Sequence, residues 1–282
     1  MEHGYHELVA LAYPTADFRE LELIGKVVVW GFLYDDRFDT DRLGGDASAA
    51  RSEAYKVARV LLGDTAPGTD VWLSSLAGVR EQAASIMAPA LLRRLTFDLV
   101  TFAYGVAEEV EMRARGEIPS TAKYLRLRME TFAWRVLVDL AEVAEGTELP
   151  DVVSRSPEYR ALLEASGRVM CWTNDLHSLQ KELRSGEQHN MVLVLRRQRG
   201  GTLEDSEAAV LAMMSDEIEQ FAEYQAALTR LADRSRLTAA DRARTARFTE
   251  RIQYLMSGQN AWCAATVRYR DPAAAEQGSL AS

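Results

Sequence analysis

The amino-acid sequence predicts an all-α fold, a single helical bundle of about ten helices. Two observations support this class. Apolar residues recur at helical spacing along nearly the whole chain, and no stretch alternates apolar and polar residues for long enough to form a sheet. Neither an internal repeat nor a linker-like segment divides the 282 residues, a length that can bury one large core around an internal cavity.

The first half of the chain contains five expected helices separated by polar or glycine-containing breaks. Residues 17–34 carry apolar positions dense enough for a mostly buried helix, which the "GGDAS" segment ends. The "GDTAPGTD" and "RGEIPS" segments are further breaks, and Pro119 with Ser120 marks the start of the next helix. The expected helices lie at residues 17–34, 46–62, 70–85, 88–115 and 120–143.

The second half continues in the same way after the stop signal "EGTELP". We expect helices at residues 151–153, 157–164, 166–184 and 191–200, a capped amphipathic helix within 200–232, and a last helix at 238–267. The small, polar residues 271–282 are expected to form a flexible tail. One domain, residues 1–270, therefore accounts for the rest of the chain.

Composition excludes several classes of protein. No apolar run is long enough for a membrane-spanning helix, the first residues lack the pattern of an export signal, and two cysteines cannot form a disulfide framework, so we expect a reduced, cytoplasmic compartment. The net charge of −9 argues against nucleic acid as a partner. His3, His6, His177 and His189 are expected to be ordinary surface or helix residues without metal-binding roles.

The segment "GFLYDDRFDTDRLGG", residues 31–45, places several carboxylates directly after an apolar stretch. Asp35 and Asp39 would share one face of a helix, with Asp36 rotated by about 100°. Two like charges one turn apart repel unless a cation lies between them, and oxygen ligands without nearby Cys or His suit Mg²⁺. The alternative is that these aspartates end a helix and face water. This segment alone leaves both interpretations open.

A second polar stripe occurs in "NDLHSLQKE", residues 174–182. Asn174, Ser178 and Glu182 are spaced by four, so on a helix they stay within about 80° of one another over about 12 Å. An amide, a hydroxyl and a carboxylate form an oxygen ligand set for one Mg²⁺. The polar face of an amphipathic helix is the alternative. However, the preceding "ASGRVMCW" indicates a core position, where polar groups without partners are unfavourable.

With these motifs in order, the chain resembles the bacterial class I terpene synthases. "DDRFD" (35–39) is similar to the aspartate-rich motif of that family, and "NDLHSLQKE" matches its ND(L/I)xSxxKE metal motif at every defining position. Arg128 lies 46 residues before Asn174, where the family has its pyrophosphate-sensing arginine, and "RY" at 268–269 completes the pattern. The resemblance spans residues 35–269.

The resemblance implies an α-helical bundle around a deep apolar cavity, and three Mg²⁺ ions with Mn²⁺ as a substitute. By position, Asp35 would ligate two ions with Asp39 near them, whereas Asp36 would pair with an arginine. Asn174, Ser178 and Glu182 would hold the third ion. The implied diphosphate contacts are Arg128, Lys181, Arg268 and Tyr269, and the implied cavity-lining aromatic residues are Phe32, Phe132 and Trp262. A homodimer is the assembly that the family suggests.

Three departures from the family pattern bear on activity. Asp35 comes so early that the segment capping the active site is expected to be short or missing, with weak catalysis as a consequence. Gly31 stands where an aromatic residue is frequent, which would enlarge the cavity or ease helix packing. "METFAW" keeps Thr131 but lacks the glycine with which the family breaks the helix after its arginine.

The expected function is Mg²⁺-dependent ionisation and cyclisation of a small-molecule isoprenyl diphosphate, with farnesyl diphosphate as first choice. The alternatives are a diterpene synthase acting on geranylgeranyl diphosphate and a catalytically impaired homologue that only binds the diphosphate. A chain-elongating prenyltransferase would need a second DDxxD, and a class II cyclase would need DxDD; neither occurs. A C10, C15 or C20 substrate and the product skeleton are not determined by sequence.

Overall fold

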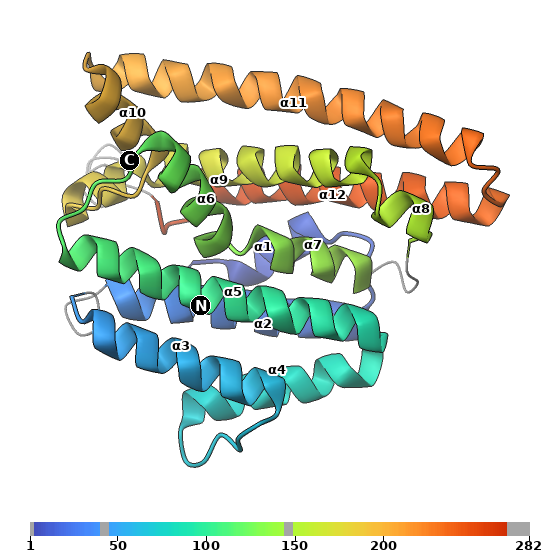
Figure 1. Cartoon of the computed structure of the whole chain (residues 1–282), viewed down its shortest axis with the longest axis horizontal. Helices are drawn as coiled ribbons and strands as arrows, with labels where there is room; N and C mark the ends of the chain where they lie inside the picture. Colours follow the sequence, from blue (N-terminus) through green and yellow to red (C-terminus); the bar gives the residue numbers. More distant parts are fainter. Residues whose placement is uncertain (1–2, 40–44, 144–148, 270–282) are drawn as a thin grey trace, which may run out of the picture.

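The computed structural model describes residues 3–39, 45–143 and 149–269, and within these ranges it contains α-helices and no strand (Figure 1). The all-α prediction is therefore confirmed. The helices are α1 (Tyr5–Ala12), α2 (Phe18–Asp39), α3 (Ala47–Leu62), α4 (Val71–Ile86), α5 (Pro89–Ala114), α6 (Thr121–Thr131), α7 (Trp134–Val143), α8 (Asp151–Ser154), α9 (Pro157–Ser185), α10 (Met191–Arg199), α11 (Leu203–Arg234) and α12 (Ala239–Ala265). The predicted tail, 271–282, lies outside the described residues.

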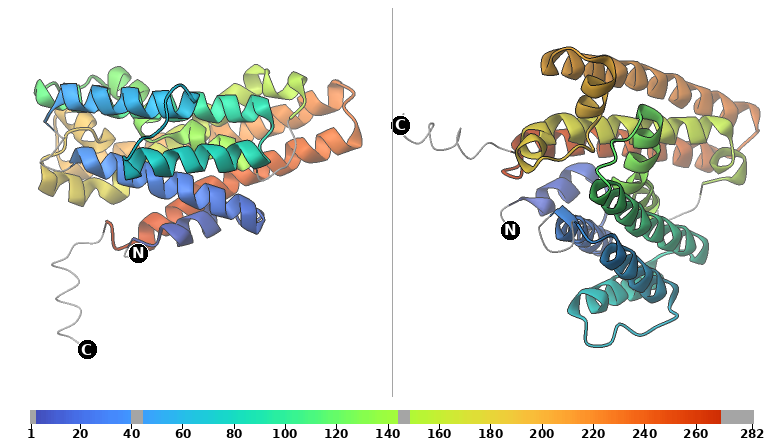
Figure 2. Two further views of the ribbon diagram at one scale, coloured as in Figure 1. Left: turned by 90° about the horizontal axis from the view of Figure 1, so that it is seen from below. Right: turned by 60° about the vertical axis from the view of Figure 1, so that its left-hand side comes forward.

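The helices are arranged around a middle group formed by α1, α2, α6 and α7. Helix α11 covers one edge of the molecule, with α9 and α12 beneath it, and α3 and α4 form the opposite edge against α5 (Figures 1 and 2). The C-terminal ends of α2, α9 and α12 lie at the same end of this bundle (Figure 1). Because the two acidic motifs are at the ends of α2 and α9, the topology brings them to one end of the molecule.

Most helix boundaries follow from capping residues that are visible in the sequence. Side-chain oxygens of Asp46, Ser120 and Ser156 accept hydrogen bonds from backbone N–H groups of the first turns of α3, α6 and α9. At the C-terminal ends, Gly63 and Gly186 adopt the left-handed conformation with φ of 79° and 74°. These signals explain why the predicted starts agree with the structure to within a residue or two.

The single helix predicted over residues 120–143 is wrong, because the structure divides it into α6 and α7. Helix α6 ends at Thr131, Ala133 has a positive φ of 56°, and α7 begins at Trp134. The backbone therefore breaks where the family pattern has glycine, although alanine pays a steric penalty in this conformation. Both α6 and α7 pack against α5 and α9. This packing outweighs the local preference for one continuous helix.

The predicted interruption near residue 165 is also wrong, since α9 runs without a break from Pro157 to Ser185. Gly167, in the middle of this helix, does not end it but allows close packing. A Cβ at this position would lie 2.6 Å from Met129 Cε and 2.9 Å from Trp134 Cδ2. The glycine is therefore required by the contact of α9 with α6 and α7.

Two differences concern the N-terminal part of the chain. Helix α2 extends to Asp39 instead of ending near residue 34, so the aspartate-rich segment forms its last turns. Helix α1, which was not predicted, packs along α12 with Leu8, Val9 and Ala12 buried. Its spacing of apolar residues in "YHELVALA" is helical, but eight residues give only a short signal.

A membrane-spanning segment is not found in the part of the chain that the structure describes, because none of its helices combines sufficient length and apolar character.

Candidate active site

A cavity of about 630 Å³ lies among α1, α2, α5, α6, α7, α9 and α12. Much of its wall is aliphatic or aromatic. The predicted aromatic residues Phe32, Phe132 and Trp262 all line it. Further apolar lining residues are Val27, Val28, Leu99, Phe102, Val136, Leu137 and Leu255. Such a wall can hold a hydrocarbon chain and contributes few groups that would retain water.

The predicted polar residues are brought to this same cavity. Asp35 on α2 and the α9 residues Asn174, Ser178 and Glu182 line it, although 139 residues separate the first two in the sequence. Arg128, Lys181, Arg268 and Tyr269 line it as well. Asp39 is the last residue of α2, and the position of its side chain lies outside the described part of the structure.

Hydrogen bonds hold the polar side chains of α9, Asn174, Ser178 and Glu182, in place. Ser178 Oγ donates to the backbone carbonyl of Asn174 at 2.7 Å, and Asn190 Nδ2 donates to Glu182 Oε2 at 2.7 Å. Burial, with a further contribution from the negative charge of Asp175, raises the pKa of Glu182 to about 7. A divalent cation beside this carboxylate would offset both effects and favour its charged form.

Arg128 is oriented by two residues of α9. Its Nε donates to Asp175 Oδ1 at 2.9 Å and its Nη2 donates to Asn174 Oδ1 at 2.5 Å. Tyr124, one turn earlier on α6, donates its hydroxyl to the other oxygen of Asp175. Although burial disfavours the charged guanidinium, Asp175 holds the pKa of Arg128 above its usual value. Arg128 therefore stays a cation inside the cavity wall.

The segment that follows α12 joins the site to α2. Arg268 binds both oxygens of Asp36, from Nη1 at 3.0 Å and from Nη2 at 2.5 Å, which makes it the arginine partner expected for Asp36. Its Nη1 also donates to the hydroxyl of Tyr5 at 3.3 Å. The neighbouring Tyr269 accepts a hydrogen bond from Asn174 Nδ2 at 2.7 Å. Residues 268–269 thus connect the two acidic motifs.

Aromatic rings form a continuous group next to this segment. Phe32 stacks on Tyr5 with ring centroids 4.6 Å apart and lies 5.5 Å from Trp262. The guanidinium of Arg268 lies 5.2 Å from the centroid of Phe32. Trp262 Nε1 donates to the backbone carbonyls of His3 and Gly4, each at 3.0 Å. The indole N–H therefore has hydrogen-bond acceptors, while the apolar ring of Trp262 lines the cavity.

Sequence reasoning missed the contribution of the first residues of the chain. His3, Leu8, Ala12 and Tyr13 line the cavity, and the hydroxyl of Tyr13 donates to the backbone carbonyl of Leu137 at 3.0 Å. The helical spacing of apolar residues in α1 was the signal that could have indicated this role. The first residues therefore form part of the wall that separates the cavity from solvent.

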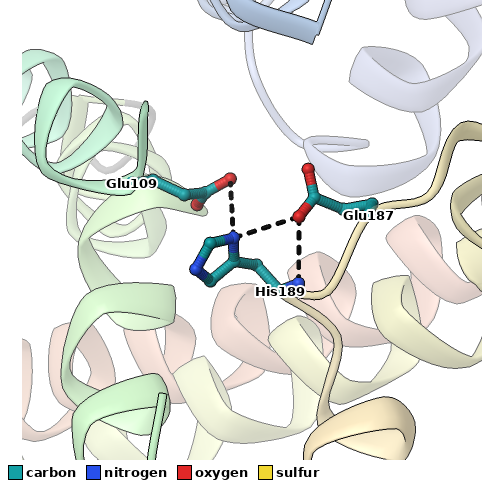
Figure 3. A group of neighbouring side chains, drawn as sticks. All are labelled: Glu109, Glu187 and His189. Carbon is teal, nitrogen blue, oxygen red and sulfur yellow. Dashed lines mark hydrogen bonds and ion pairs between the residues drawn. The ribbon is translucent and has the colours of Figure 1, made fainter. Parts of the chain in front are cut away.

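A charged cluster formed by Glu109, Arg113, Glu187 and His189 also lines the cavity. Figure 3 shows the two glutamates and the histidine of this cluster. His189 Nδ1 lies 3.0 Å from Glu187 Oε1 and 4.0 Å from Glu109 Oε1, and Arg113 Nη2 lies 3.0 Å from both carboxylates. Despite burial, these carboxylates raise the pKa of His189, whereas the pKa of Glu187 is lowered to about 2 by His189 and Arg113 against the effect of burial.

His189 is therefore not the surface or helix residue that the sequence predicted. This residue is 6% exposed, lies in the loop between α9 and α10, and contacts two glutamates distant in the sequence. Glu109, Glu187 and His189 could act as metal ligands only if His189 lost its proton and the ion pairs of Arg113 were broken. His189 and Arg113 face the carboxylates of Glu187 and Glu109. These opposite charges form an ion-pair network that fixes the loop to α5.

The donor set along α2 and α9 fits Mg²⁺. Asp35, Asn174, Ser178 and Glu182 offer only oxygen ligands, and the carboxylate of Glu182 has a raised pKa that a cation would counteract. Asn174, Ser178 and Glu182 follow one another at successive turns of α9, as the sequence spacing predicted. These four residues could therefore hold Mg²⁺.

Comparison with known proteins agrees with this geometry. A family model described as "Terpene synthase family 2, C-terminal metal binding" matches residues 26–220. Pentalenene synthase from Streptomyces arenae is 31% identical over 277 residues, covering 94% of this chain and 79% of the relative. A 7-epi-alpha-eudesmol synthase from Streptomyces viridochromogenes, named as cyclizing (2E,6E)-farnesyl diphosphate, is 27% identical and covers 98% of this chain and 81% of the relative.

Among solved structures, the linalool/nerolidol synthase from Streptomyces clavuligerus in complex with 2-fluorogeranyl diphosphate is similar at a TM-score of 0.82 and 26% identity. The similarity covers 94% of this chain and 87% of that one. The bundle with its cavity and two acidic motifs thus defines a class I terpene synthase. The chain belongs to terpene synthase family 2 and is a lyase of that class.

Proposed function

We propose that the protein uses Mg²⁺ to ionise and cyclise farnesyl diphosphate, releasing pyrophosphate and a sesquiterpene. The observation that carries the proposal is that a cavity of about 630 Å³ combines an apolar wall with oxygen ligands and cationic side chains from α2, α6, α9 and the segment that follows α12. One relative is named for cyclizing farnesyl diphosphate, and one similar structure contains a fluorinated geranyl diphosphate. Both names support an isoprenyl diphosphate as the substrate class.

The cationic side chains would act on the leaving group. Arg128, whose pKa is held high by Asp175, and Arg268, which lies over Phe32, would donate hydrogen bonds to the diphosphate. Lys181 and Tyr269 lie at the same cavity and would add further donors. Bound Mg²⁺ would neutralise the charge that develops as the allylic carbon–oxygen bond breaks. Fixed donors of this kind stabilise a transition state without reorganising.

The apolar part of the cavity would control the carbocation. Water would capture it at any stage, so the aliphatic wall must exclude solvent while the chain folds. The faces of Phe32, Phe132 and Trp262 would stabilise positive charge without forming bonds to it. Proton loss from the final cation, or its capture by water, completes the reaction and sets the product.

The test is incubation with geranyl, farnesyl and geranylgeranyl diphosphate in the presence of Mg²⁺, with product analysis by gas chromatography and a pyrophosphate assay. We expect a C15 product from farnesyl diphosphate, abolished by EDTA, restored by Mg²⁺ and partly supported by Mn²⁺. The Asn174→Ala and Glu182→Ala variants should lose turnover. A product only from geranylgeranyl diphosphate would instead establish the diterpene synthase, and binding without turnover would establish the impaired homologue.

We also propose three Mg²⁺ ions in the loaded enzyme, a homodimeric assembly and a cytoplasmic setting. These follow from the resemblance to the family and from the two cysteines, both of which are free and buried. Metal titration in the presence of pyrophosphate would count the ions, and light scattering would give the molar mass relative to the 31.5 kDa chain.

A further inference from the structure

Asn190 lies behind the metal-ligand stripe, in the loop between α9 and α10, and is fully buried at 0% exposure. Its Nδ2 donates to Glu182 Oε2 and to the backbone carbonyl of Asp175, each at 2.7 Å. Its Oδ1 accepts a hydrogen bond from Val192 N at 2.9 Å and caps α10. One amide group therefore connects a proposed ligand, the backbone of α9 and the start of α10.

We propose that Asn190 is a positioning residue that holds the Glu182 carboxylate in the orientation required for the third Mg²⁺. The inference rests on the proposed function. The Nδ2 group binds one oxygen of Glu182 from the protein side. Loss of a partner that orients a ligating side chain in this way typically lowers metal affinity or activity by about 10- to 100-fold.

The loop that carries Asn190 is fixed by contacts that do not involve the side chain of Glu182. Glu187 and His189 bind Arg113 and Glu109 of α5, as Figure 3 shows for the two glutamates and the histidine. Gly186 turns the chain out of α9 in the left-handed conformation. Because these contacts place the backbone of residues 186–190, the amide of Asn190 is presented to Glu182 by a preformed support.

The geometry separates this role from a purely structural one. The cap on α10 uses Oδ1, whereas the contact with Glu182 uses Nδ2. Asn190→Ser keeps a cap-forming oxygen but is too short to reach Glu182 as the amide does. Asp46→Ser, at the exposed start of α3 and not among the residues that line the cavity, is the control for a change of capping residue.

The experiment measures binding of inorganic pyrophosphate by calorimetry at several Mg²⁺ concentrations, together with thermal unfolding without ligands. We expect Asn190→Ser to weaken Mg²⁺-dependent pyrophosphate binding by about 10- to 100-fold. Its melting temperature should fall only modestly, because the buried carbonyl of Asp175 also loses a partner. Both properties of Asp46→Ser should stay close to those of the unaltered protein. In a Glu182→Gln background the serine substitution should add little, because the contact it removes is already altered.

Unchanged pyrophosphate affinity in Asn190→Ser would overturn the inference while leaving the proposed function in place. Effects that simply add in the double variant, or a large loss of thermal stability that accompanies the loss of binding, would also overturn it in favour of a structural role. If the unaltered protein shows no Mg²⁺-dependent pyrophosphate binding, the proposed function itself fails, and the inference fails with it.

Discussion

At the scale of single residues, the site is organised by side chains that contact two partners at once. Arg128 binds Asp175 and Asn174 through different nitrogens, and Asn174 binds Tyr269 through its amide nitrogen. Each group therefore depends on the position of the next one. This geometry requires a planar, multidentate cation at residue 128 and not merely a positive charge.

Replacing Arg128 by Lys should lower kcat for farnesyl diphosphate by about 100-fold or more, because an ammonium cannot hold Asp175 and Asn174 in the same geometry. Arg126→Lys is the matched control. Arg126 lies on the same helix but pairs at the surface with Glu108 and Glu130, so its replacement should leave kcat within about twofold. Steady-state product assays check both variants, and equal effects would contradict the assignment.

The cluster around His189 should make stability depend on pH. The pKa of His189 is raised in the folded state, so its charge contributes stability below the unfolded pKa of about 6.5, and this contribution disappears as pH rises through the folded pKa. Glu187, whose pKa is about 2, stays charged over this range, while Glu109 and Arg113 complete the surroundings.

We therefore expect His189→Gln to destabilise the protein more at about pH 6 than at about pH 9, as measured by urea denaturation. Gln188→Ala alters an exposed neighbour in the same loop and should show a difference that does not depend on pH. If His189→Gln destabilises the protein equally at both pH values, the charge of the histidine does not contribute to stability.

At the scale of helices, close packing decides two features that local preference did not. Helix α9 continues through residue 165, and Gly167 allows it to approach Met129 and Trp134. The break between α6 and α7 occurs at Ala133, which adopts a left-handed conformation without being glycine. In both places the contacts between helices outweigh a local preference of about 1 kcal/mol.

Gly167→Ala should lower the free energy of unfolding by about 1–3 kcal/mol, because the added methyl group overlaps Met129 and Trp134. Gly78→Ala is the control: this exposed position in α4 has nothing within 4 Å of an added Cβ and should gain up to about 1 kcal/mol from helix propensity. Chemical denaturation distinguishes the two, and equal changes would show that packing at α9 is loose.

At the scale of the whole molecule, the N-terminal helix closes the cavity against α12. A Cβ at Gly258 of α12 would lie 2.4 Å from the backbone oxygen of Leu11, so α1 can approach only because that position is glycine. Residues of α1 and its flanks line the cavity and support Trp262 through the carbonyls of His3 and Gly4. We therefore expect the exclusion of water from the cavity to depend on this contact.

Gly258→Ala should displace α1 and admit water to the cavity. We expect a larger share of hydroxylated products from farnesyl diphosphate and a lower melting temperature, measured by gas chromatography and thermal unfolding. Gly25→Ala in α2, where nothing lies within 4 Å of an added Cβ, should leave the product ratio unchanged. An unaltered ratio in Gly258→Ala would show that α1 is not part of the solvent barrier.

The sequence by itself determined the helical class, most helix starts and the two acidic motifs. Capping side chains and apolar periodicity act over a few residues, so they can be recognised locally. The spacing of Asn174, Ser178 and Glu182 likewise follows from helical geometry alone. The roles of these residues, and that of Asp39, remain predictions for the experiments above.

Only the tertiary structure decided how these local elements meet. The pairing of Asp36 with Arg268, the place of α1 in the cavity wall, the break at Ala133 and the burial of His189 beside Glu109 all join residues distant in the chain. Such contacts depend on the packing of whole helices, whose energy is shared among many side chains. No short stretch of sequence contains that information.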